Sequence, residues 1–266
     1  MIVNCPLGCK ACHLRFNAQR CTREFLNMTD PPAIQAGSIT KIFSDIVANT
    51  HGLLGPVTTL STDPWIITID NFVSDAEVEA LLGSVEAWER STDTGQFNEF
   101  GEQGRILSSG RTSANAWCRS SCEDLPDVAR LIEKIETTTT VPRENYESFQ
   151  ILRYEVGQHY NTHHDTSEED YLLLSGPRIL TMFLYLSDVE EGGETEFPRL
   201  GLKVKPQKGK ALLWPGVMDT DPSRIDRRTS HTALPVIRGR KFAANSWIHL
   251  NDFQKPNLWG CTGAFD

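Results

Sequence analysis

The sequence predicts a mainly β protein with flanking α-helices, built around an antiparallel sandwich or barrel. After about residue 146 the chain consists of runs rich in β-branched and aromatic residues, separated by turn signals and without a helical period. The helical patterns lie before those runs, and strands do not alternate with helices, which argues against a parallel sheet. The strand-like runs are "ESFQILRYEVGQHY", "RILTMFLYLSD", "GKALLWPG" and "RKFAANSWIHL".

Three elements are expected before residue 146. Residues 65–69 are apolar and mostly β-branched, so they predict a strand. Ser74 is a candidate N-cap with carboxylates in the turn that follows, and it marks the start of a helix. The segment "LPDVARLIEKIE" predicts a second amphipathic helix. The apolar faces of the two helices consist of Val78, Leu81 and Leu82, and of Val128, Leu131, Ile132 and Ile135.

The beginning of the chain has a different character from the rest. Residues 1–40 form a cysteine-rich N-terminal segment, and residues 41–63 are predicted to be a linker. The linker prediction depends on the Gly, Pro, Ser and Thr content of "GLLGPVTTLSTDP". A folded domain is expected to start near residue 64.

Composition excludes some classes of function. The net charge of −9 argues against a nucleic-acid binder that relies on phosphate contacts. No run of about 18 apolar residues is present, so no membrane-spanning helix is expected. The N-terminus lacks the apolar core of a signal peptide, which leaves a cytosolic protein or a chain without its leader. Whether Met1 is the native start is left open.

Seven cysteines are unevenly distributed, with four of them in the first 21 residues. Their spacing is poor for structural zinc, so a disulfide knot is favoured over a metal site or unpaired thiols. A later pair is expected to bridge locally, or one of its members to pair with the last cysteine. A glycosylation sequon at Asn27 favours the secretory pathway. The cysteines are Cys5, Cys9, Cys12 and Cys21, then Cys118 and Cys122, and finally Cys261.

The segment "YEVGQHYNTHHD" holds three histidines and an aspartate within seven residues. A His-x-Asp pair on a strand places both side chains on one face, which suits an iron(II) site of two imidazoles and one carboxylate. His163 and Asp165 form such a pair, and His231 is the candidate third ligand from a later strand. His159 and His164 are not expected to bind metal.

Four segments together resemble the catalytic domain of prolyl 4-hydroxylases. They are "RYEVGQHYNTHHD", "RILTMFLYLSDVEEGGETEFP", "VKPQKGKALLW" and "SHTALPVIRGRKFAANSWIH". The resemblance covers residues 64–252 and leaves residues 253–266 as a C-terminal tail. It implies a double-stranded β-helix, a jelly-roll fold like that of the cupins. It also implies Fe(2+), 2-oxoglutarate and O2 as cofactor and cosubstrates, with L-ascorbate as reductant.

The resemblance also implies roles for single residues. His163, Asp165 and His231 would bind iron, and Lys241 would bind the far carboxylate of 2-oxoglutarate, as suits a compact point charge. The other matched positions are Tyr154, Thr195 and Trp247 around 2-oxoglutarate, and Tyr160, Arg178 and Arg111 toward the substrate.

The activity implied is that of a procollagen-proline 4-dioxygenase-like enzyme. It would hydroxylate a proline-rich peptide or protein in the endoplasmic reticulum or secretory pathway, with the cytoplasm as the alternative. Two other functions remain open: hydroxylation of a free amino acid, a lysyl residue or a cytosolic regulatory proline, and binding without catalysis. The sequence indicates neither the substrate motif nor the oligomeric state.

Overall fold

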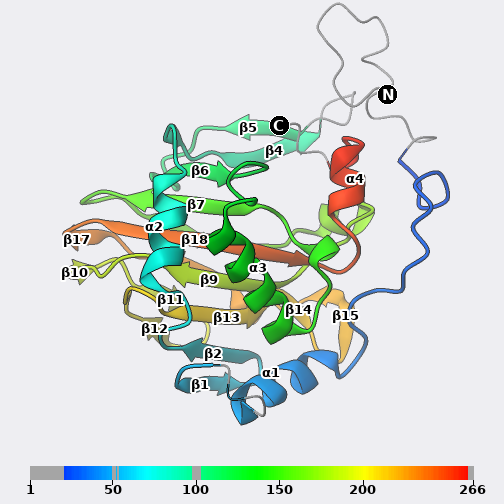
Figure 1. The fold of residues 1–266 in the computed structure, drawn as a ribbon, viewed down its shortest axis with the longest axis horizontal. Coiled ribbons are helices and arrows are strands. Elements are labelled where there is room, and N and C mark those ends of the chain that lie inside the picture. The colour runs from blue at the N-terminus through cyan, green and yellow to red at the C-terminus, as the bar shows by residue number, and fades with distance from the viewer. Residues whose placement is uncertain (1–20, 50–51, 53, 98–102, 263–266) are drawn as a thin grey trace, which may run out of the picture.

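A computed structural model describes residues 21–49, 52, 54–97 and 103–262 (Figure 1). Two antiparallel sheets share one apolar cluster, in which aromatic side chains of the larger sheet meet residues of the smaller one. Tyr154 and Phe183 come from the larger sheet, and Phe197 and Ala233 come from the smaller one. This arrangement confirms the predicted antiparallel, mainly β fold with a double-stranded β-helix core.

The larger sheet has eight strands, and its middle strands are almost entirely buried. Alternating and continuous apolar patterns in these strands explain why one face packs on helices and the other on the second sheet. In spatial order the strands are β1 (Val57–Thr62), β2 (Trp65–Ile69), β13 (Ala211–Pro215), β9 (Arg178–Tyr185), β18 (Lys241–His249), β7 (Phe149–Tyr154), β6 (Ala114–Cys118) and β3 (Glu89–Arg90).

The smaller sheet has four strands, in the order β12 (Leu202–Val204), β11 (Thr195–Phe197), β16 (His231–Ala233) and β8 (Tyr160–His163). Three two-stranded pairs complete the β structure. They are β10 (Glu191–Gly192) with β17 (Val236–Arg238), β14 (Val217–Met218) with β15 (Asp221–Ile225), and β4 (Asp93–Phe97) with β5 (Gln103–Ile106).

Two of the four α-helices in the described part of the chain, α2 (Asp75–Gly83) and α3 (Pro126–Thr139), lie on the outer face of the larger sheet (Figure 1). Both were predicted, and Ser74 forms a complete capping box with Glu77 at the start of α2. The other two are α1 (Ser38–Ala48) and the short α4 (Gln254–Leu258). Among the described residues, no helix is long and apolar enough to cross a membrane.

The predicted linker over residues 41–63 is wrong. Most of it belongs to α1, whose apolar face is part of the core, and to β1, which pairs with β2. The linker was predicted from the composition of the residues after α1. The helix itself has apolar residues at spacings of three and four, namely Ile39, Ile42, Phe43 and Ile46. The Asp219 side chain also accepts hydrogen bonds from the backbone N–H groups of Ile39 and Thr40 at the start of this helix. Asp219 and Ile39 are 180 residues apart in the sequence.

Among the described residues, four cysteines form two disulfides. Cys118 pairs locally with Cys122, and Cys21 pairs with Cys261 across 240 residues. Cys261 therefore does not pair with Cys118 or Cys122, and Cys21 does not join a knot confined to the N-terminal segment. Cys5, Cys9 and Cys12 lie outside the described residues.

The ion pair between Glu77 and Lys134 joins α2 to α3, with N–O distances of 2.7 and 2.8 Å. Glu77 is buried, and its carboxylate also accepts the backbone N–H of Ser74. Replacing Glu77 with alanine therefore removes the carboxylate half of the capping box and leaves the partly buried Lys134 ammonium without its carboxylate partner. We expect the free energy of unfolding to fall by about 2–3 kcal/mol, measured by urea denaturation. Glu79→Ala on the exposed side of α2 is the control, and an equal loss in both variants would contradict this role.

Candidate active site

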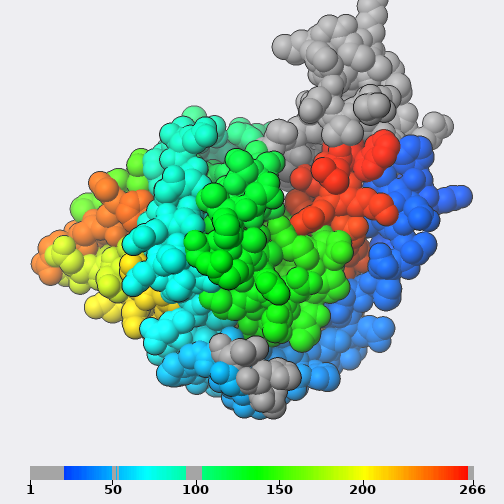
Figure 2. All heavy atoms as spheres, in the orientation of Figure 1, coloured from blue at the N-terminus to red at the C-terminus, as the bar shows by residue number. Residues whose placement is uncertain are grey.

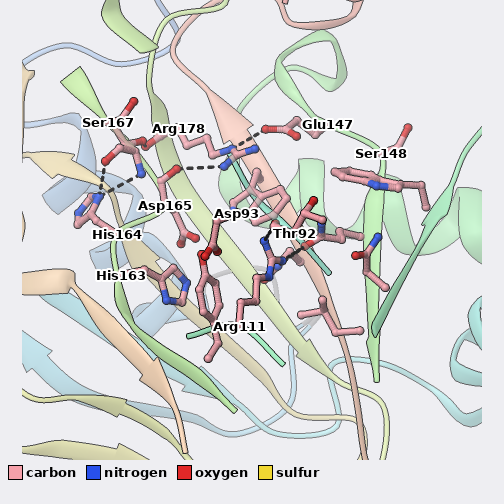
Figure 3. Close-up of a pocket in the computed structure, with 18 of the residues that line it drawn as sticks. Thr92, Asp93, Arg111, Glu147, Ser148, His163, His164, Asp165, Ser167 and Arg178 are labelled. Carbon is pink, nitrogen blue, oxygen red and sulfur yellow. Dashed lines mark hydrogen bonds and ion pairs between the residues drawn. The ribbon is translucent and has the colours of Figure 1, made fainter. Parts of the chain in front are cut away.

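Three predicted metal ligands meet at one end of the smaller sheet. His163 ends β8, Asp165 follows two residues later, and His231 begins β16 directly opposite His163. One ligand atom from each of the three residues lies within 4.8 Å of the others, and Asp165 Oδ2 is 3.8 Å from His231 Nε2. Figure 3 shows His163 and Asp165 side by side in the cavity. The strand register thus brings His163 and His231 together, although they lie 68 residues apart in the chain.

Backbone carbonyls fix the tautomers of both imidazoles. His163 Nδ1 is 2.8 Å from the carbonyl oxygen of Asn161, and His231 Nδ1 is 3.1 Å from that of Thr229. A carbonyl oxygen only accepts, so each Nδ1 carries the proton and each Nε2 keeps its lone pair. Both histidines are therefore prepared to bind a metal through Nε2.

The charge state of the three residues also suits a divalent metal. Burial favours the neutral acid at Asp165, but His231, His163 and Arg178 and a hydrogen bond from Thr181 lower its pKa to about 2. Burial holds the pKa of His163 well below its usual value, and it lowers that of His231 as well. Two neutral imidazoles and one carboxylate result, which is the donor set of non-haem iron(II) oxygenases.

The other two histidines of the segment lie outside this group. His164 Nε2 is 3.1 Å from the carbonyl oxygen of Asp226, and its Nδ1 accepts the backbone N–H of Thr166. His159 contacts Thr112 and the carbonyl of Gly157. His164 therefore ties the segment that carries Asp165 to the loop before His231.

A buried lysine lies behind two aromatic residues of the cavity wall, Tyr154 and Phe183. Lys241 begins β18, pairs with Tyr154 of β7 and is 0% exposed. Its ammonium donates to the Gly193 carbonyl at 2.8 Å, and three aromatic rings surround it at 5.3 to 5.5 Å. Burial lowers its pKa to about 7, and Glu194 opposes that shift only partly. Among the described residues no carboxylate lies within ion-pair distance, so the site fits an anionic ligand.

The hydroxyl donors predicted for the same ligand are present at this end. Tyr154 and Thr195 both line the cavity and are buried. Thr195 accepts a hydrogen bond of 2.8 Å from Tyr185, a residue that the sequence analysis did not identify. Tyr185 therefore orients the Thr195 hydroxyl, and only the alternation of β9 indicated that its side chain points inward.

A cavity of about 550 Å³ extends from the metal ligands to Tyr154, Phe183 and Thr195, the wall behind which Lys241 lies. It is lined by residues of both sheets and of the β4–β5 hairpin, so metal ligands and candidate substrate residues share one space (Figure 3). The lining residues predicted from the sequence are His163, Asp165, His231, Tyr154, Thr195, Trp247, Tyr160, Arg178 and Arg111.

Two of the predicted substrate residues lie beside the metal ligands. The Tyr160 ring stacks on His163 with centroids 3.6 Å apart, and the Arg111 guanidinium lies 4.6 Å from the Tyr160 centroid. Arg111 is held by the Thr92 carbonyl at 2.9 Å and by Gln150 at 3.1 Å. These contacts fix the guanidinium over the ring on one side of the metal ligands.

Arg178 holds the other side of the same region. It pairs with Glu147 at 2.5 Å, donates to the Asp165 carbonyl at 3.1 Å and stacks over Trp247 at 3.8 Å. Glu147 also contacts His249 at 2.7 Å. Glu147 and His249 were not identified from the sequence because neither belongs to a recognisable spacing.

Trp247 lies about 20 Å along β18 from Lys241, as six residues of a strand imply. Its recorded contacts are with Arg178 and with Trp117, whose ring centroid is 6.2 Å away. These contacts group Trp247 with the substrate residues. Its assignment to the 2-oxoglutarate pocket stays a prediction.

Comparisons with known proteins agree with this geometry. Residues 149–249 match the family model of the 2OG-Fe(II) oxygenase superfamily. The chain is 34% identical over 225 residues to "Probable prolyl 4-hydroxylase 9" of Arabidopsis thaliana, covering 76% of this chain and 77% of that protein. It is 32% identical over 236 residues to "Prolyl 4-hydroxylase 2" of the same plant, covering 79% and 76%.

Among solved structures, a viral collagen prolyl hydroxylase from Paramecium Bursaria Chlorella virus-1 in complex with 2OG has a TM-score of 0.52. It is 26% identical in sequence, and the alignment covers 69% of this chain and 95% of that one. The shared fold, the three metal-ligand residues and the curated relatives lead to one conclusion. The chain belongs to the prolyl 4-hydroxylase family of Fe(II)- and 2-oxoglutarate-dependent dioxygenases.

Proposed function

We propose that this enzyme hydroxylates peptidyl proline to 4-hydroxyproline and converts 2-oxoglutarate and O2 to succinate and CO2. One observation carries the proposal: a metal-ligand set with both Nε2 atoms free lines a cavity, and a buried lysine lies behind the Tyr154 and Phe183 rings of the same cavity. Among the described residues no carboxylate pairs with that lysine. The names of the curated relatives support proline as the target.

Different residues of the site have different proposed roles. Iron(II), held by His163, Asp165 and His231, would supply O2 activation coupled to oxidative decarboxylation of 2-oxoglutarate. Lys241 would bind the far carboxylate of that cosubstrate. Thr181 holds the Asp165 carboxylate by a hydrogen bond of 2.8 Å and so fixes its direction.

The substrate side of the cavity is built from held aromatic and guanidinium groups. Tyr160 is stacked on His163 and lies under the Arg111 guanidinium, and Trp247 lies under the Arg178 guanidinium, so stacked aromatic and guanidinium groups line this side. Such a surface suits a proline ring and an extended proline-rich chain, which is already stiff and loses little entropy on binding. We therefore propose a proline-rich peptide or protein as substrate.

We also propose that the protein works in the endoplasmic reticulum or secretory pathway, with L-ascorbate as reductant. Two disulfides and an exposed Asn27 in a glycosylation sequon support that compartment. The test is to express the protein in cells and measure its mass before and after glycosidase treatment. We expect the treatment to lower the mass. A thiol-reduced protein of unmodified mass in the cytoplasm would contradict this compartment.

A peptide panel tests the proposed activity. Purified enzyme with iron(II), 2-oxoglutarate and ascorbate is expected to release succinate and add one oxygen atom to proline in proline-rich peptides. Free proline, a lysine peptide and a peptide without proline are the comparison substrates. Turnover of free proline or of the lysine peptide alone would overturn the proposal while preserving the dioxygenase.

The pH dependence of 2-oxoglutarate binding follows from the pKa of Lys241, which is about 7 in the free protein. A bound carboxylate favours the ammonium, so above pH 7 the ligand binds together with a proton. Below pH 7 the lysine is already charged. We expect the dissociation constant to be level below pH 7 and to rise by up to about tenfold per pH unit above it.

Calorimetry of 2-oxoglutarate binding to the manganese-loaded protein, in two buffers of different ionisation enthalpy, measures that proton uptake directly. Tyr154, Tyr185 and Glu194 are the other titratable groups near the ammonium. Lys241→Arg is the control, because a guanidinium stays charged and should remove the pH dependence. A dependence that persists in this variant would assign the proton to another group.

A further inference from the structure

Three uncharged amide side chains lie on neighbouring strands in the cavity wall formed by the larger sheet. Asn115 comes from β6, Gln150 from β7 and Asn245 from β18, and all three line the cavity. The register places Gln150 directly opposite Asn245, and it places Asn115 opposite Leu152, the next residue of β7 on the same face. We call these three amides the amide row. The helices α2 and α3 cover the outer face of the sheet (Figure 2), and the amide row lies on the face toward the cavity.

The orientation of two of these amides follows from the contact of Gln150 with Arg111. The Arg111 guanidinium donates to Gln150 Oε1 at 3.1 Å, and because a guanidinium only donates, the oxygen of this amide faces it. Asn245 Nδ2 donates to the same oxygen at 3.3 Å, so the nitrogen of the Asn245 amide faces Gln150. Gln150 Nε2 is thereby left as a free donor, and Asn245 Oδ1 is left as a free acceptor.

The free amide atoms are buried but still reachable. Asn115, Gln150 and Asn245 are 8%, 6% and 8% exposed. Within the described part of the chain, the Asn115 amide, Gln150 Nε2 and Asn245 Oδ1 have no hydrogen-bond partner. None of these atoms is among the fully covered polar atoms that lack a partner, so each keeps surface that a group in the cavity can contact. Buried amides are nearly always paired, so a free donor beside a free acceptor indicates a ligand that offers both kinds of group.

Strand register places the amide row close to the metal ligands. Asn245 lies opposite Phe183 of β9, and Thr181, which holds the Asp165 carboxylate, lies two residues from Phe183 on the same strand. Two strand residues span about 7 Å. A polyproline II chain rises about 3.1 Å per residue, so this separation corresponds to roughly two residues of a bound peptide.

The main chain of a peptide offers the groups that the amide row lacks. A polyproline II segment forms no internal hydrogen bonds, so its carbonyl and N–H groups need partners when the cavity encloses them. Every residue supplies a carbonyl, but proline supplies no N–H. The main chain can therefore pair with the Asn245 oxygen only at a residue other than proline.

We propose that the amide row binds the substrate main chain at one residue other than proline, within about two residues of the target proline. The N–H of that residue donates to Asn245 Oδ1, and a neighbouring carbonyl accepts from Gln150 or Asn115. The amide row thus selects proline-rich sequences that are interrupted at one position over an unbroken run of prolines. This proposal rests on the proposed prolyl hydroxylation and names the substrate class of that same cavity.

The first test uses the wild-type enzyme and changes only the peptide. In one series of proline-rich peptides, alanine occupies in turn each of the two positions on either side of one target proline. In the matched series L-lactic acid replaces that alanine, so an ester takes the place of the amide and the N–H is lost without added bulk. At one position we expect the ester to raise KM about fivefold to fiftyfold, with kcat unchanged.

The outcomes of this test separate the two proposals. Equal KM values for the amide and ester peptides at every position would overturn the role of the amide row and leave the proposed function intact. An unbroken proline peptide with a KM as low as that of the best alanine peptide would contradict the selection. Absence of hydroxylation in every peptide would overturn the proposed function itself.

The second test assigns the ester effect to the amide row. Asn245→Ala should bring the ratio of the KM values for the ester and amide peptides close to one, because the acceptor is gone. Gln35→Ala, which removes an exposed amide outside the cavity, should keep the wild-type ratio. KM for 2-oxoglutarate should stay unchanged in both variants. A wild-type ratio in folded Asn245→Ala, or a change confined to KM for 2-oxoglutarate, would overturn the assignment. Circular dichroism checks the fold, and the wild-type peptide series stands without any variant.

Discussion

Alanine in place of His163 is expected to abolish hydroxylation and reduce metal affinity beyond measurement. Removing a group that merely supports a metal ligand costs roughly 10–100-fold in affinity or activity. His163 is itself one of three candidate ligands, so its loss should exceed that range and lower 2-oxoglutarate-dependent succinate release at least about 1,000-fold. Titration with cobalt(II), followed by its visible absorption, measures the loss of the site without requiring turnover.

The loss is expected to be large because the site has only three protein ligands and because hydrogen bonds already hold each of them in position. Asn161 and Thr229 hold the two Nδ1–H groups, and Thr181 holds the carboxylate, so the three ligand atoms converge before any metal arrives. Alanine at position 163 removes one of these prepared atoms and the ring on which Tyr160 stacks. The remaining aspartate and histidine retain only a two-point site.

His159→Ala is the matched control for this prediction. It removes the same side chain from the same segment, but His159 contacts Thr112 and Gly157 and is not among the cavity-lining residues. The two variants should therefore differ in cobalt binding by orders of magnitude while showing similar folds by circular dichroism. Equal loss in both, or full turnover by His163→Ala, would contradict the metal assignment.

The spacing of His163 and Asp165 was enough to predict that both side chains line the cavity. Lys241 was predicted to bind 2-oxoglutarate, and it lies behind the cavity-lining rings of Tyr154 and Phe183. Alternation along a strand determines the face on which a side chain lies. His163 and Asp165 have the same parity, and so do Lys241 and Trp247. Alternation does not determine the position along the cavity. Trp247 has the same parity as Lys241, yet its contacts are with Arg178 at the substrate end.

Other features depended on contacts that no local pattern encodes. Glu147 and His249 meet Arg178 only because β9 and β18 pair in one register, with His249 opposite Arg178. The Cys21–Cys261 disulfide joins residues 240 apart, and several pairings of seven cysteines were possible. The helix α1 was missed for a different reason, since glycine and proline after it dominated the composition of that stretch.

Methionine in place of Lys241 is expected to have two effects of opposite sign, a loss of 2-oxoglutarate binding and a gain in stability of the ligand-free protein. The loss should reach about 100-fold or more in the KM for 2-oxoglutarate, because a buried carboxylate would face an apolar side chain. The proline peptide should keep its KM, since it binds at the other end of the cavity.

The gain in stability follows from burial of a cation without an anionic partner. Burial lowers the pKa of Lys241 from 10.5 to about 7, which corresponds to a cost on the order of 5 kcal/mol for the charged form. Below pH 7 both the folded and the unfolded protein hold the proton, so the full cost is present. Between pH 7 and 10.5 the folded protein releases it first, and the cost declines. The advantage of Lys241→Met should therefore be largest below pH 7 and should fade toward pH 10.5.

Urea denaturation at pH 6.5 and pH 9.5, with and without saturating 2-oxoglutarate and manganese(II), separates the two effects. The ligand should stabilise the wild type and leave the stability of Lys241→Met unchanged. The difference in free energy of unfolding between the two proteins should therefore shrink or change sign when the ligand is present. Lys203→Met on the exposed edge of the smaller sheet is the control and should show neither effect. A Lys241→Met protein that is less stable than the wild type at pH 6.5 would mean that the ammonium is compensated within the fold. In that case the anion site would lie elsewhere in the cavity.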